Sequence, residues 1–475
     1  MTFLRKTSII VSTVANLLFL LTGIMPYQHY QQEQLLQQLH YFNTAEAGRE
    51  DECIDYDESE NTININCNAS FLDVVQTIND PDIVENLGNG EYLLNANLEV
   101  SDGMTFEMTS SNQDGGLRYL KIADANGIIV YGTILIDGVK ITSWDASSEQ
   151  IIQQNINGSI RRAYIQFDES EGSQIINSEF GYLGFQEIGK RGFDLWGPDA
   201  SYSGEGSSHD MVIRGSEFHD MWFAFYSRGA YNIVVDGNEY YNNIKYALDP
   251  HSGTHDMSIT NNWLHHNPIG AICSDRCSNI LIEGNRVEYN RDHGIYFSRN
   301  MHDSIVRNNH VSNTTSGITV SESPNNRIYN NTIEGATSQG IRLFNPPEPP
   351  YDGLTENNLV YNNIIASSED GISATRSHDN ILENNTFSNI QSSEYRLSGD
   401  ASIVIRGQHF DNALIAEIGS STNNLVEIVD SGIIAVNDPA DDDDDDEEQE
   451  GTYFNTDDTP YRKTISDGDS ILINS

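Results

Sequence analysis

The stretch IVVDGNEYYNN, Ile233–Asn243, returns further along the chain as ILIEGNRVEYN at 280–290 and as SIVRNNHVSNT at 304–314. Each copy has an alternating apolar run, a Gly-Asn or Asn-Asn pair, and a second short run. Alternation with a period of two predicts short strands, and the pair predicts a tight turn between them. Two such strands cannot bury an apolar face alone, but stacked copies can. The stretch therefore predicts a solenoid of repeated rungs.

The second residue of each pair gives the length of a rung. It recurs every 22 to 24 residues, with one interval of 32 that holds the segment NPPEPPYDGL at 345–354, which reads as an inserted loop. The positions are Asn238, Asn262, Asn285, Asn309, Asn331, Asn363 and Asn385. Asn tolerates left-handed backbone geometry, and stacked Asn side chains hydrogen-bond between rungs. Because the repeat lacks a helical half and regularly spaced Leu, it predicts an all-β chain, a right-handed parallel β-helix.

The two ends of the chain depart from this repeat. Arg5 and Lys6 precede an uncharged run, Thr7–Met25, whose length suits a secretory signal peptide or a membrane anchor; a helix buried in the fold is the third interpretation. The first two interpretations both place the remaining chain outside the cell, either secreted or anchored at the surface. The acidic run Asp441–Glu448 predicts a disordered linker. The expected divisions are a signal or anchor at 1–30, a linker at 31–50, an N-terminal part of the β-helix with its cap at 51–160, the regular β-helix with a catalytic groove at 161–395, its C-terminal end at 396–438, and an acidic, disordered tail at 439–475.

Composition restricts the partners. A formal net charge of −46 argues against nucleic acid, and it requires a local basic surface for any anionic substrate. The four cysteines suit an extracellular chain and fall into two close pairs, Cys53 with Cys67 and Cys273 with Cys277, so we expect two local disulfides. Their spacing does not predict a zinc site, and no other metal site is identified. We expect a monomer.

A second marker recurs in the repeats, a small residue that precedes a short alternating run, as at Gly270, Gly294, Gly317, Gly340 and Gly371, and it can serve as position zero. The residues at positions +1 and +3 are apolar and are expected to face the core, so those at positions 0, +2 and +4 are predicted to point outward. Ala224, Ala247 and Gly294 are three such markers. Rungs lie ~4.8 Å apart, so outward residues of successive rungs should share one face. That face is predicted to hold Tyr226, Arg228, Tyr246, Asp249, His251, Tyr296 and Arg299, with Lys245, Arg276, Arg291 and His293 at its edges. Tyr offers ring contact and Arg pairs with carboxylates, which suits an elongated anionic sugar chain.

The segment YALDPH, Tyr246–His251, resembles the Tyr-Gly-x-Asp-Pro-His motif of mannuronan C5-epimerases. The resemblance extends over roughly Gly132 to Phe344 and is nearest to the periplasmic bacterial type. The chain departs from the motif at Ala247, where the family has Gly, and at Ser252, where the periplasmic type usually has a second acid. The family's catalytic Arg has two candidates here, Arg291 and Arg299.

The resemblance implies an isomerase that converts D-mannuronate to L-guluronate within an alginate-like polymer. It implies that His251 and Tyr246 transfer protons, and we assign His251 as the base and Tyr246 as the donor. Asp249 would orient His251 or, if protonated, hydrogen-bond the substrate carboxylate. Tyr246 would need nearby cations, such as Lys245, to lower its pKa. Arg228, Arg291 or Arg299 would neutralise the carboxylate, and the expected substrate contacts are Arg228, Tyr226, Lys245, Arg276, Tyr296 and His293.

Two other functions stay open at this point. A polyuronate lyase shares the first proton abstraction and then expels the glycosidic oxygen, and residue types alone do not separate it from an epimerase. A surface adhesin or carbohydrate-binding β-helix would use the same face without turnover. A glycoside hydrolase is disfavoured, because it needs two flanking carboxylates and Asp249 has no obvious outward acidic partner on adjacent rungs. The sequence requires no cofactor, and calcium stays open as a ligand.

Overall fold

The computed structural model describes residues 53–110, 116–196, 207–347, 354–399 and 401–406, and beyond them the backbone of strands between 416 and 474. The runs Thr7–Met25 and Asp441–Glu448 lie outside the described residues. From Cys53 onward the chain forms one compact unit. Among the described helices, none has the length and apolar character needed to cross a membrane.

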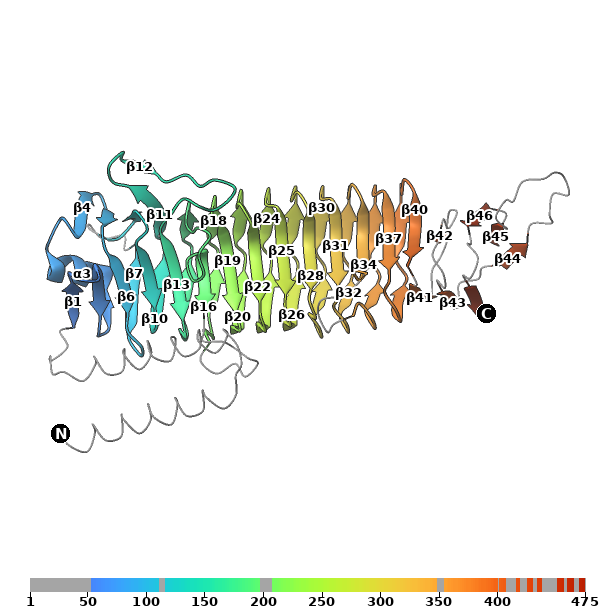
Figure 1. Ribbon diagram of the computed structural model, residues 1–475, viewed down its shortest axis with the longest axis horizontal. Helices are drawn as coiled ribbons and strands as arrows, with labels where there is room; N and C mark the ends of the chain where they lie inside the picture. Colours follow the sequence, from blue (N-terminus) through green and yellow to red (C-terminus); the bar gives the residue numbers. More distant parts are fainter. Residues whose placement is uncertain are drawn as a thin grey trace, which may run out of the picture. The chain divides into compact units, whose positions relative to one another are not determined.

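The chain from Cys53 winds into a column of rungs whose strands line up in three long sheets (Figure 1). We name the 18-stranded sheet the first, the 15-stranded sheet the second and the 14-stranded sheet the third. One rung runs from β22 (Tyr246–His251) in the first sheet through β23 (His255–Thr260) to β24 (Trp263–His265). The next rung begins at β25 (Ile269–Ser274), which pairs in parallel with β22. The parallel β-helix predicted from the sequence is confirmed, but each rung has three strands where the repeat suggested two.

The rungs of the regular part repeat these three strands. In the first sheet they are β13 (Tyr164–Asp168), β16 (Gly192–Trp196), β19 (Phe223–Arg228), β22, β25, β28 (His293–Ser298), β31 (Ser316–Ser321), β34 (Gln339–Phe344), β37 (Asp370–Thr375) and β40 (Ser393–Ser398). In the second they are β14 (Gln174–Ile176), β17 (Val212–Arg214), β20 (Tyr231–Asp236), β23, β26 (Ser278–Glu283), β29 (Ile305–Arg307), β32 (Arg327–Tyr329), β35 (Leu359–Tyr361), β38 (Asn380–Glu383) and β41 (Ser402–Arg406). In the third they are β15 (Glu179–Gly181), β18 (Glu217–His219), β21 (Glu239–Tyr241), β24, β27 (Arg286–Glu288), β30 (His310–Ser312), β33 (Thr332–Glu334), β36 (Ile364–Ala366) and β39 (Thr386–Ser388). The long 32-residue interval falls between β34 and β35, where the inserted loop was expected.

The turn between the second and third sheets is held by a ladder of buried Asn side chains. Each amide nitrogen donates to the side-chain oxygen of the Asn one rung on, at 3.0 Å from Asn238 to Asn262 and 3.0 Å from Asn262 to Asn285. The ladder continues through Asn309, Asn331, Asn363 and Asn385. The left-handed geometry belongs to the first residue of each pair, for example Asn261 with φ 56°. The expected ladder is confirmed. The left-handed backbone geometry and the hydrogen bonds between rungs, which were both expected of one Asn, belong to two neighbouring residues.

The marker position is buried, contrary to the prediction that it points outward. Ala224 and Ala247 are 0% exposed, and the glycine markers are buried as well. A Cβ built on Gly294 would lie 2.4 Å from a methyl of Val311 and 2.7 Å from the Gly317 carbonyl oxygen. Only a very small residue fits there, because the strand begins in a corner packed against the third sheet and the next rung. Positions +1 and +3 do fill the core, as Ile295 and Phe297 show at 0% exposure.

The N-terminal end of the column is closed by a short helix, α3 (Phe71–Ile78). Ser70 and Asp73 form a capping box at its start, and Phe71 and Val74 bury its apolar side. The strands around it are β1 (Ile54–Asp57), β2 (Thr62–Ile65), β3 (Ala69–Ser70), β4 (Val84–Gly88), β5 (Glu91–Leu94), β6 (Asn97–Val100), β7 (Thr105–Thr109), β8 (Tyr119–Ala123), β9 (Gly127–Val130), β10 (Thr133–Asp137), β11 (Lys140–Asp145) and β12 (Gln150–Ile151).

The cysteines bear out one expected disulfide and not the other. Cys53 and Cys67 are bonded next to the cap. The prediction of a bond between Cys273 and Cys277 is wrong, since both are free, buried thiols. Cys277 instead donates a hydrogen bond to the carbonyl of Ser274 at 3.1 Å, and burial raises the pKa of Cys273. Both thiols therefore belong to the interior of the column.

Strands continue past β41 toward the C-terminus. They are β42 (Ala416–Ile418), β43 (Leu425–Val429), β44 (Ile434–Asn437), β45 (Gly451–Thr456), β46 (Thr459–Thr464) and β47 (Ser470–Asn474). β42 pairs with β40, and β43 pairs with both β41 and β47. The segment 439–475, expected as an acidic, disordered tail, therefore contains the strands β45, β46 and β47.

Candidate active site

Strand β22 carries Tyr246, Asp249 and His251, and its neighbour β19 pairs with it in the predicted register. Tyr226 stands opposite Asp249, and Arg228 stands opposite His251. In a parallel ladder, side chains in register on the same face lie one above another. The outer face of the first sheet thus brings these residues together, as the marker rule predicted.

His251 is a mostly buried imidazole with two neighbours that fix its ring. Its Nδ1 lies 2.6 Å from the Ser252 hydroxyl, and that hydroxyl donates to Asp275 Oδ2 at 3.0 Å. The other side of the ring packs on Tyr226, with centroids 5.6 Å apart. Burial lowers the pKa of His251 to about 4, against the opposing effect of Asp275. The imidazole is therefore neutral near pH 7 and has a free lone pair.

Asp249 is only 3% exposed, and burial raises its pKa well above the usual value. Arg191 and Arg299 oppose that rise but do not cancel it. Its Oδ1 has no hydrogen-bond partner among the described residues. A buried, unpaired carboxyl oxygen is costly in a native fold unless a ligand completes it. Burial therefore favours the protonated form of Asp249, which is able to donate a hydrogen bond to an anion.

A second acid, Asp194 on β16, lies in register with Tyr226 and Asp249, and the sequence analysis did not identify it. The register runs from Asp194 to Tyr226 and on to Asp249, so this face carries a second acid two rungs from Asp249. Asp194 is 0% exposed, and burial raises its pKa to about 6. Arg191 Nη1 lies 3.5 Å from Asp194, and its guanidinium sits 3.8 Å from the centre of the Tyr226 ring. Counting from Gly192 as a marker would have placed Asp194 at +2.

Tyr246 begins β22 beside an open pocket. Its ring meets Phe223 edge-on at 5.2 Å, and a cavity of about 460 Å³ is lined by both rings together with Arg191, Trp222 and Lys245. Burial raises the pKa of Tyr246, and Asp249 adds to the rise while Arg299 opposes it. The expectation that cations lower this pKa is wrong, because desolvation outweighs them. Tyr246 therefore keeps its proton and can only donate it.

The two arginine candidates separate clearly. Arg299, in left-handed geometry with φ 61°, acts electrostatically on Tyr246, Asp249 and His251. Arg291 instead pairs with its own neighbour Asp292 at 2.9 Å, and its side chain is 68% exposed. Of these two candidates, Arg299 is thus the one that the fold brings to the three residues of β22.

The remaining predicted residues lie around this centre. Arg228 covers the ring of Trp196 at 4.8 Å, and Lys245 lies 5.1 Å from the ring of Trp222 in the pocket wall. Arg276 pairs with Asp275 at 3.0 Å. On β28, His293 and Tyr296 pack together at 4.6 Å, and burial lowers the pKa of His293 to about 4.

Arg342, on β34, is a further cation of this face that the sequence reading did not list. Arg342 is in register with Thr319, which is in register with Tyr296, so the three residues stack on successive rungs. Arg342 stands at +2 from the marker Gly340. The marker rule could therefore have found it. Arginines from several rungs thus supply the local basic surface that the acidic chain requires.

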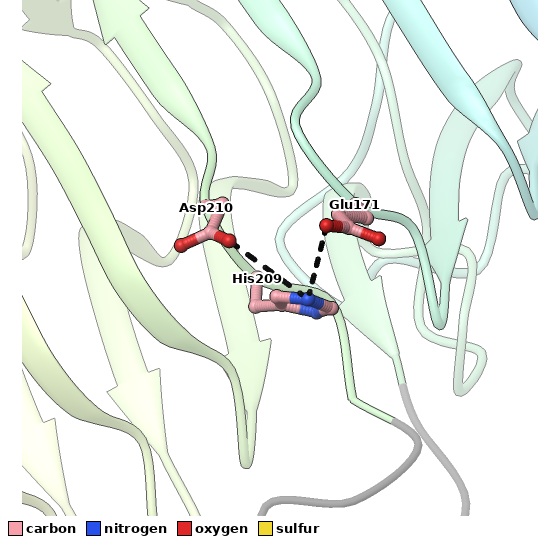
Figure 2. Close-up of side chains that lie close together, drawn as sticks. All are labelled: Glu171, His209 and Asp210. Carbon is pink, nitrogen blue, oxygen red and sulfur yellow. Dashed lines mark ion pairs between the residues drawn. The ribbon is translucent and has the colours of Figure 1, made fainter.

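A separate trio of possible metal ligands lies outside this face (Figure 2). Glu171, His209 and Asp210 bring one ligand atom each within 4.8 Å of the others. His209 Nε2 is 3.9 Å from both carboxylates, and the Glu171 side chain is 72% exposed. Glu171 lies between β13 and β14, and His209 and Asp210 directly precede β17, so the trio comes from turns and not from the strands of the first sheet.

Comparison with known proteins gives the same fold and the same relatives. Residues 203–348 match the family model described as a right-handed beta helix region. A mannuronan C5-epimerase of Pseudomonas syringae pathovar tomato is 26% identical over 251 residues, 51% of this chain and 46% of that protein. The mannuronan C5-epimerase AlgG of Azotobacter vinelandii is 35% identical over 133 residues, 27% of this chain and 25% of that protein. The chain thus matches less than half the length of these curated relatives.

The crystal structure of the periplasmic alginate epimerase AlgG has the same architecture. It superposes with a TM-score of 0.58 at 18% identity, covering 87% of this chain and 84% of that one. At this identity the likeness speaks for the fold. The resemblance inferred from YALDPH is confirmed: this chain is a right-handed parallel β-helix related to the mannuronan C5-epimerases.

Proposed function

We propose that this chain is a polysaccharide C5-epimerase that converts D-mannuronate to L-guluronate in an alginate-like polyuronate. One observation carries the proposal. Tyr246, Asp249 and His251, from a single strand, share the field of Arg299 and hold protonation states that suit the reaction. The sequence similarity to mannuronan C5-epimerases supports the substrate class.

The first requirement of the reaction is an acidic C5–H bond. A uronate carboxylate must be neutralised before the adjacent carbon can lose a proton, because the electron pair moves into the carboxyl group. Arg299 supplies a positive charge for this, and protonated Asp249 supplies a hydrogen bond to a carboxylate oxygen. Both groups act in a buried setting, where such interactions are stronger than in water.

The second requirement is a base and an acid on opposite sides of the sugar. Neutral His251 takes H5 through its lone pair, and Tyr246 donates its hydroxyl proton to the other face of C5. They lie five positions apart along β22, or ~16 Å between their Cα atoms, which leaves space for a sugar ring between the side chains. Exchange with solvent then returns the proton from His251 and restores Tyr246, so the reaction is a net isomerisation.

The lyase alternative has no observation in its favour beyond the shared first step. A hydrolase would need two carboxyl groups flanking the glycosidic bond. Asp194 and Asp249 lie two rungs apart, but both are buried, and Asp194 is held beside Arg191. A binding module does not require a neutral His and a protonated Asp side by side.

The polymer is the only partner that the proposal requires, and the reaction needs no cofactor. The location is extracytoplasmic, in keeping with the acidic chain, the Cys53–Cys67 disulfide and the periplasmic relative of the same fold. The same proposal includes an N-terminal run that serves as a signal peptide or a membrane anchor, and a monomeric chain. The contribution of calcium is measured by the experiment below.

Incubation of the purified protein with polymannuronate, followed by proton NMR, tests the function. Guluronate anomeric signals are the expected result. Unsaturated chain ends would replace the epimerase with a lyase, and an unchanged polymer under all conditions would overturn the proposal. Parallel samples with calcium and with a chelator measure the contribution of the ion.

A further inference from the structure

We infer that Glu171, His209 and Asp210 bind a divalent cation that accepts nitrogen and oxygen ligands, such as zinc, and that the ion joins the turns of two successive rungs (Figure 2). The three side chains offer one imidazole nitrogen and two carboxylate oxygens, all within 4.8 Å of one another. Zinc takes this set of donor atoms in proteins. The sequence analysis did not identify the site, because Glu171 and His209 lie far apart in the chain and meet only where their rungs stack.

The backbone fixes the positions of the three residues. Glu171 and His209 form a parallel β-bridge, and the Gly172 N–H donates to the His209 carbonyl at 3.1 Å. The Glu171 carbonyl also accepts from the Thr133 hydroxyl at 2.7 Å. Asp210 has left-handed geometry with φ 55°, a conformation that Asp tolerates. Both turns are therefore anchored before any ion binds.

Two groups outside the trio orient its ligand atoms. His209 Nδ1 lies 3.0 Å from the Ser207 carbonyl oxygen, which can only accept, so Nδ1 carries a proton and Nε2 is the atom that faces both carboxylates. Asn232, one rung on, donates to Asp210 Oδ1, which leaves Oδ2 toward the imidazole. The imidazole also stacks on the ring of Tyr231 at 4.7 Å. Ligands of bound metals have such outer partners, since a hydrogen bond on the far atom fixes the ligand atom.

An ion pair without a metal is the alternative for this trio, and the distances argue against it. His219 shows that arrangement, with its two nitrogens 2.8 and 3.2 Å from two carboxylates. His209 Nε2 instead lies 3.9 Å from both Glu171 and Asp210, which is too far for a hydrogen bond to either. Zinc at ~2.1 Å from each atom would hold neighbouring ligand atoms ~3.4 Å apart. Small rotations of the two exposed carboxylate side chains are enough to reach that spacing.

The next His-Asp pair of the chain, His255 and Asp256, has the same turn but lacks the third ligand. Asp256 also has left-handed geometry, with φ 51°, and Asn279 one rung on donates to it. The His255 ring, however, turns Nδ1 toward Asp256 at 2.7 Å. The residue one rung before His255 is Tyr231, which offers no carboxylate. This pair therefore gives matched control variants.

The test titrates the full-length protein with zinc in excess calcium, which occupies sites made of oxygen ligands alone. Calorimetry should show one zinc ion bound tightly per chain, and the ion should raise the melting temperature. Asn232→Ala should lower the affinity ~10- to 100-fold, the usual effect of losing an outer partner. Glu171→Gln and His209→Ala remove a ligand and should lower it further. The controls His255→Ala and Asn279→Ala should bind zinc as the wild type does.

Three outcomes would overturn the inference. Zinc that does not bind, or that excess calcium displaces, would show that no imidazole nitrogen takes part. Wild-type affinity in His209→Ala would place the ion elsewhere, as would a zinc-edge anomalous peak away from the trio in crystals grown with one equivalent of zinc. Glu171→Gln keeps the size of an exposed side chain, so the result does not depend on a variant that unfolds. None of these readouts uses epimerase activity, so failure of this inference and failure of the proposed function are distinguishable.

Discussion

The Asn ladder and the outer face of the first sheet both bury polar side chains, but they satisfy them differently. In the ladder, Asn285 donates to Asn309 and to the Ile259 carbonyl, and its oxygen accepts from Asn262. On the outer face, Asp249 and Asp194 each keep an oxygen with no partner among the described residues. The ladder is complete without a ligand, whereas the face is not. Fully satisfied burial marks structure, and unsatisfied burial marks the place where a substrate completes the contacts.

Of the changes on the outer face, replacing His251 by Ala should lower turnover most and should leave the stability of the fold almost unchanged. We expect kcat to fall by ~10²–10⁴, the usual contribution of a general base, while the melting temperature stays near that of the wild type. Guluronate formation by NMR measures the first, and calorimetry measures the second. Retained turnover would mean that His251 is not the base.

Arg299→Ala should come next, and Arg291→Ala is its matched control. Arg299 acts on all three residues of β22, so we expect a loss of ~10²-fold or more in kcat, comparable to removal of one charge-stabilising donor. Arg291 pairs with Asp292 on the surface, so its variant should keep the wild-type rate. The reverse ranking would return the carboxylate-neutralising role to Arg291.

Asn285→Ala should break the ladder instead. The change leaves donors and acceptors of Asn262, Asn309 and Ile259 without partners, and we expect a loss of ~2–4 kcal/mol in the free energy of unfolding. Urea titration followed by circular dichroism gives this value. Since the ladder lies away from β22, the folded variant should keep its specific activity at low temperature. A stable Asn285→Ala protein would show that the ladder is not a main source of stability.

The smallest expected effect is a pH dependence of stability from His251. Because burial lowers its pKa from 6.5 to about 4, its neutral form stabilises the fold above pH 6.5, and that contribution is lost as the pH falls toward 4. The loss is on the order of 2 kcal/mol. His251→Gln should flatten the melting temperature between pH 6.5 and 4 relative to the wild type. Equal slopes in the two proteins would argue against a neutral buried imidazole.

The prediction from sequence was strongest where the parallel register governs position. Counting from the markers placed Tyr226 opposite Asp249 and Arg228 opposite His251, and the same count reaches Asp194 and Arg342 once it starts from Gly192 and Gly340. The count failed for the marker itself, because the strand begins in a packed corner where alternation does not decide which side is exposed. The sequence analysis also predicted the wrong direction for the pKa of Tyr246, since the spacing of residues does not show how deeply a side chain is buried.

The sequence by itself determined the period, the ladder and the columns of the first sheet, because one interval repeated along the chain fixes which residues stack. Only the tertiary structure decided which arginine reaches β22 and which carboxylate supports His251. Arg299 and Asp275 both leave their strands in left-handed turns, with φ of 61° and 62°. At such turns the side chain no longer follows strand alternation, so its direction depends on contacts between rungs. The polar cluster in YALDPH was thus visible in the sequence, but the groups that complete it come from the folded rungs beside it.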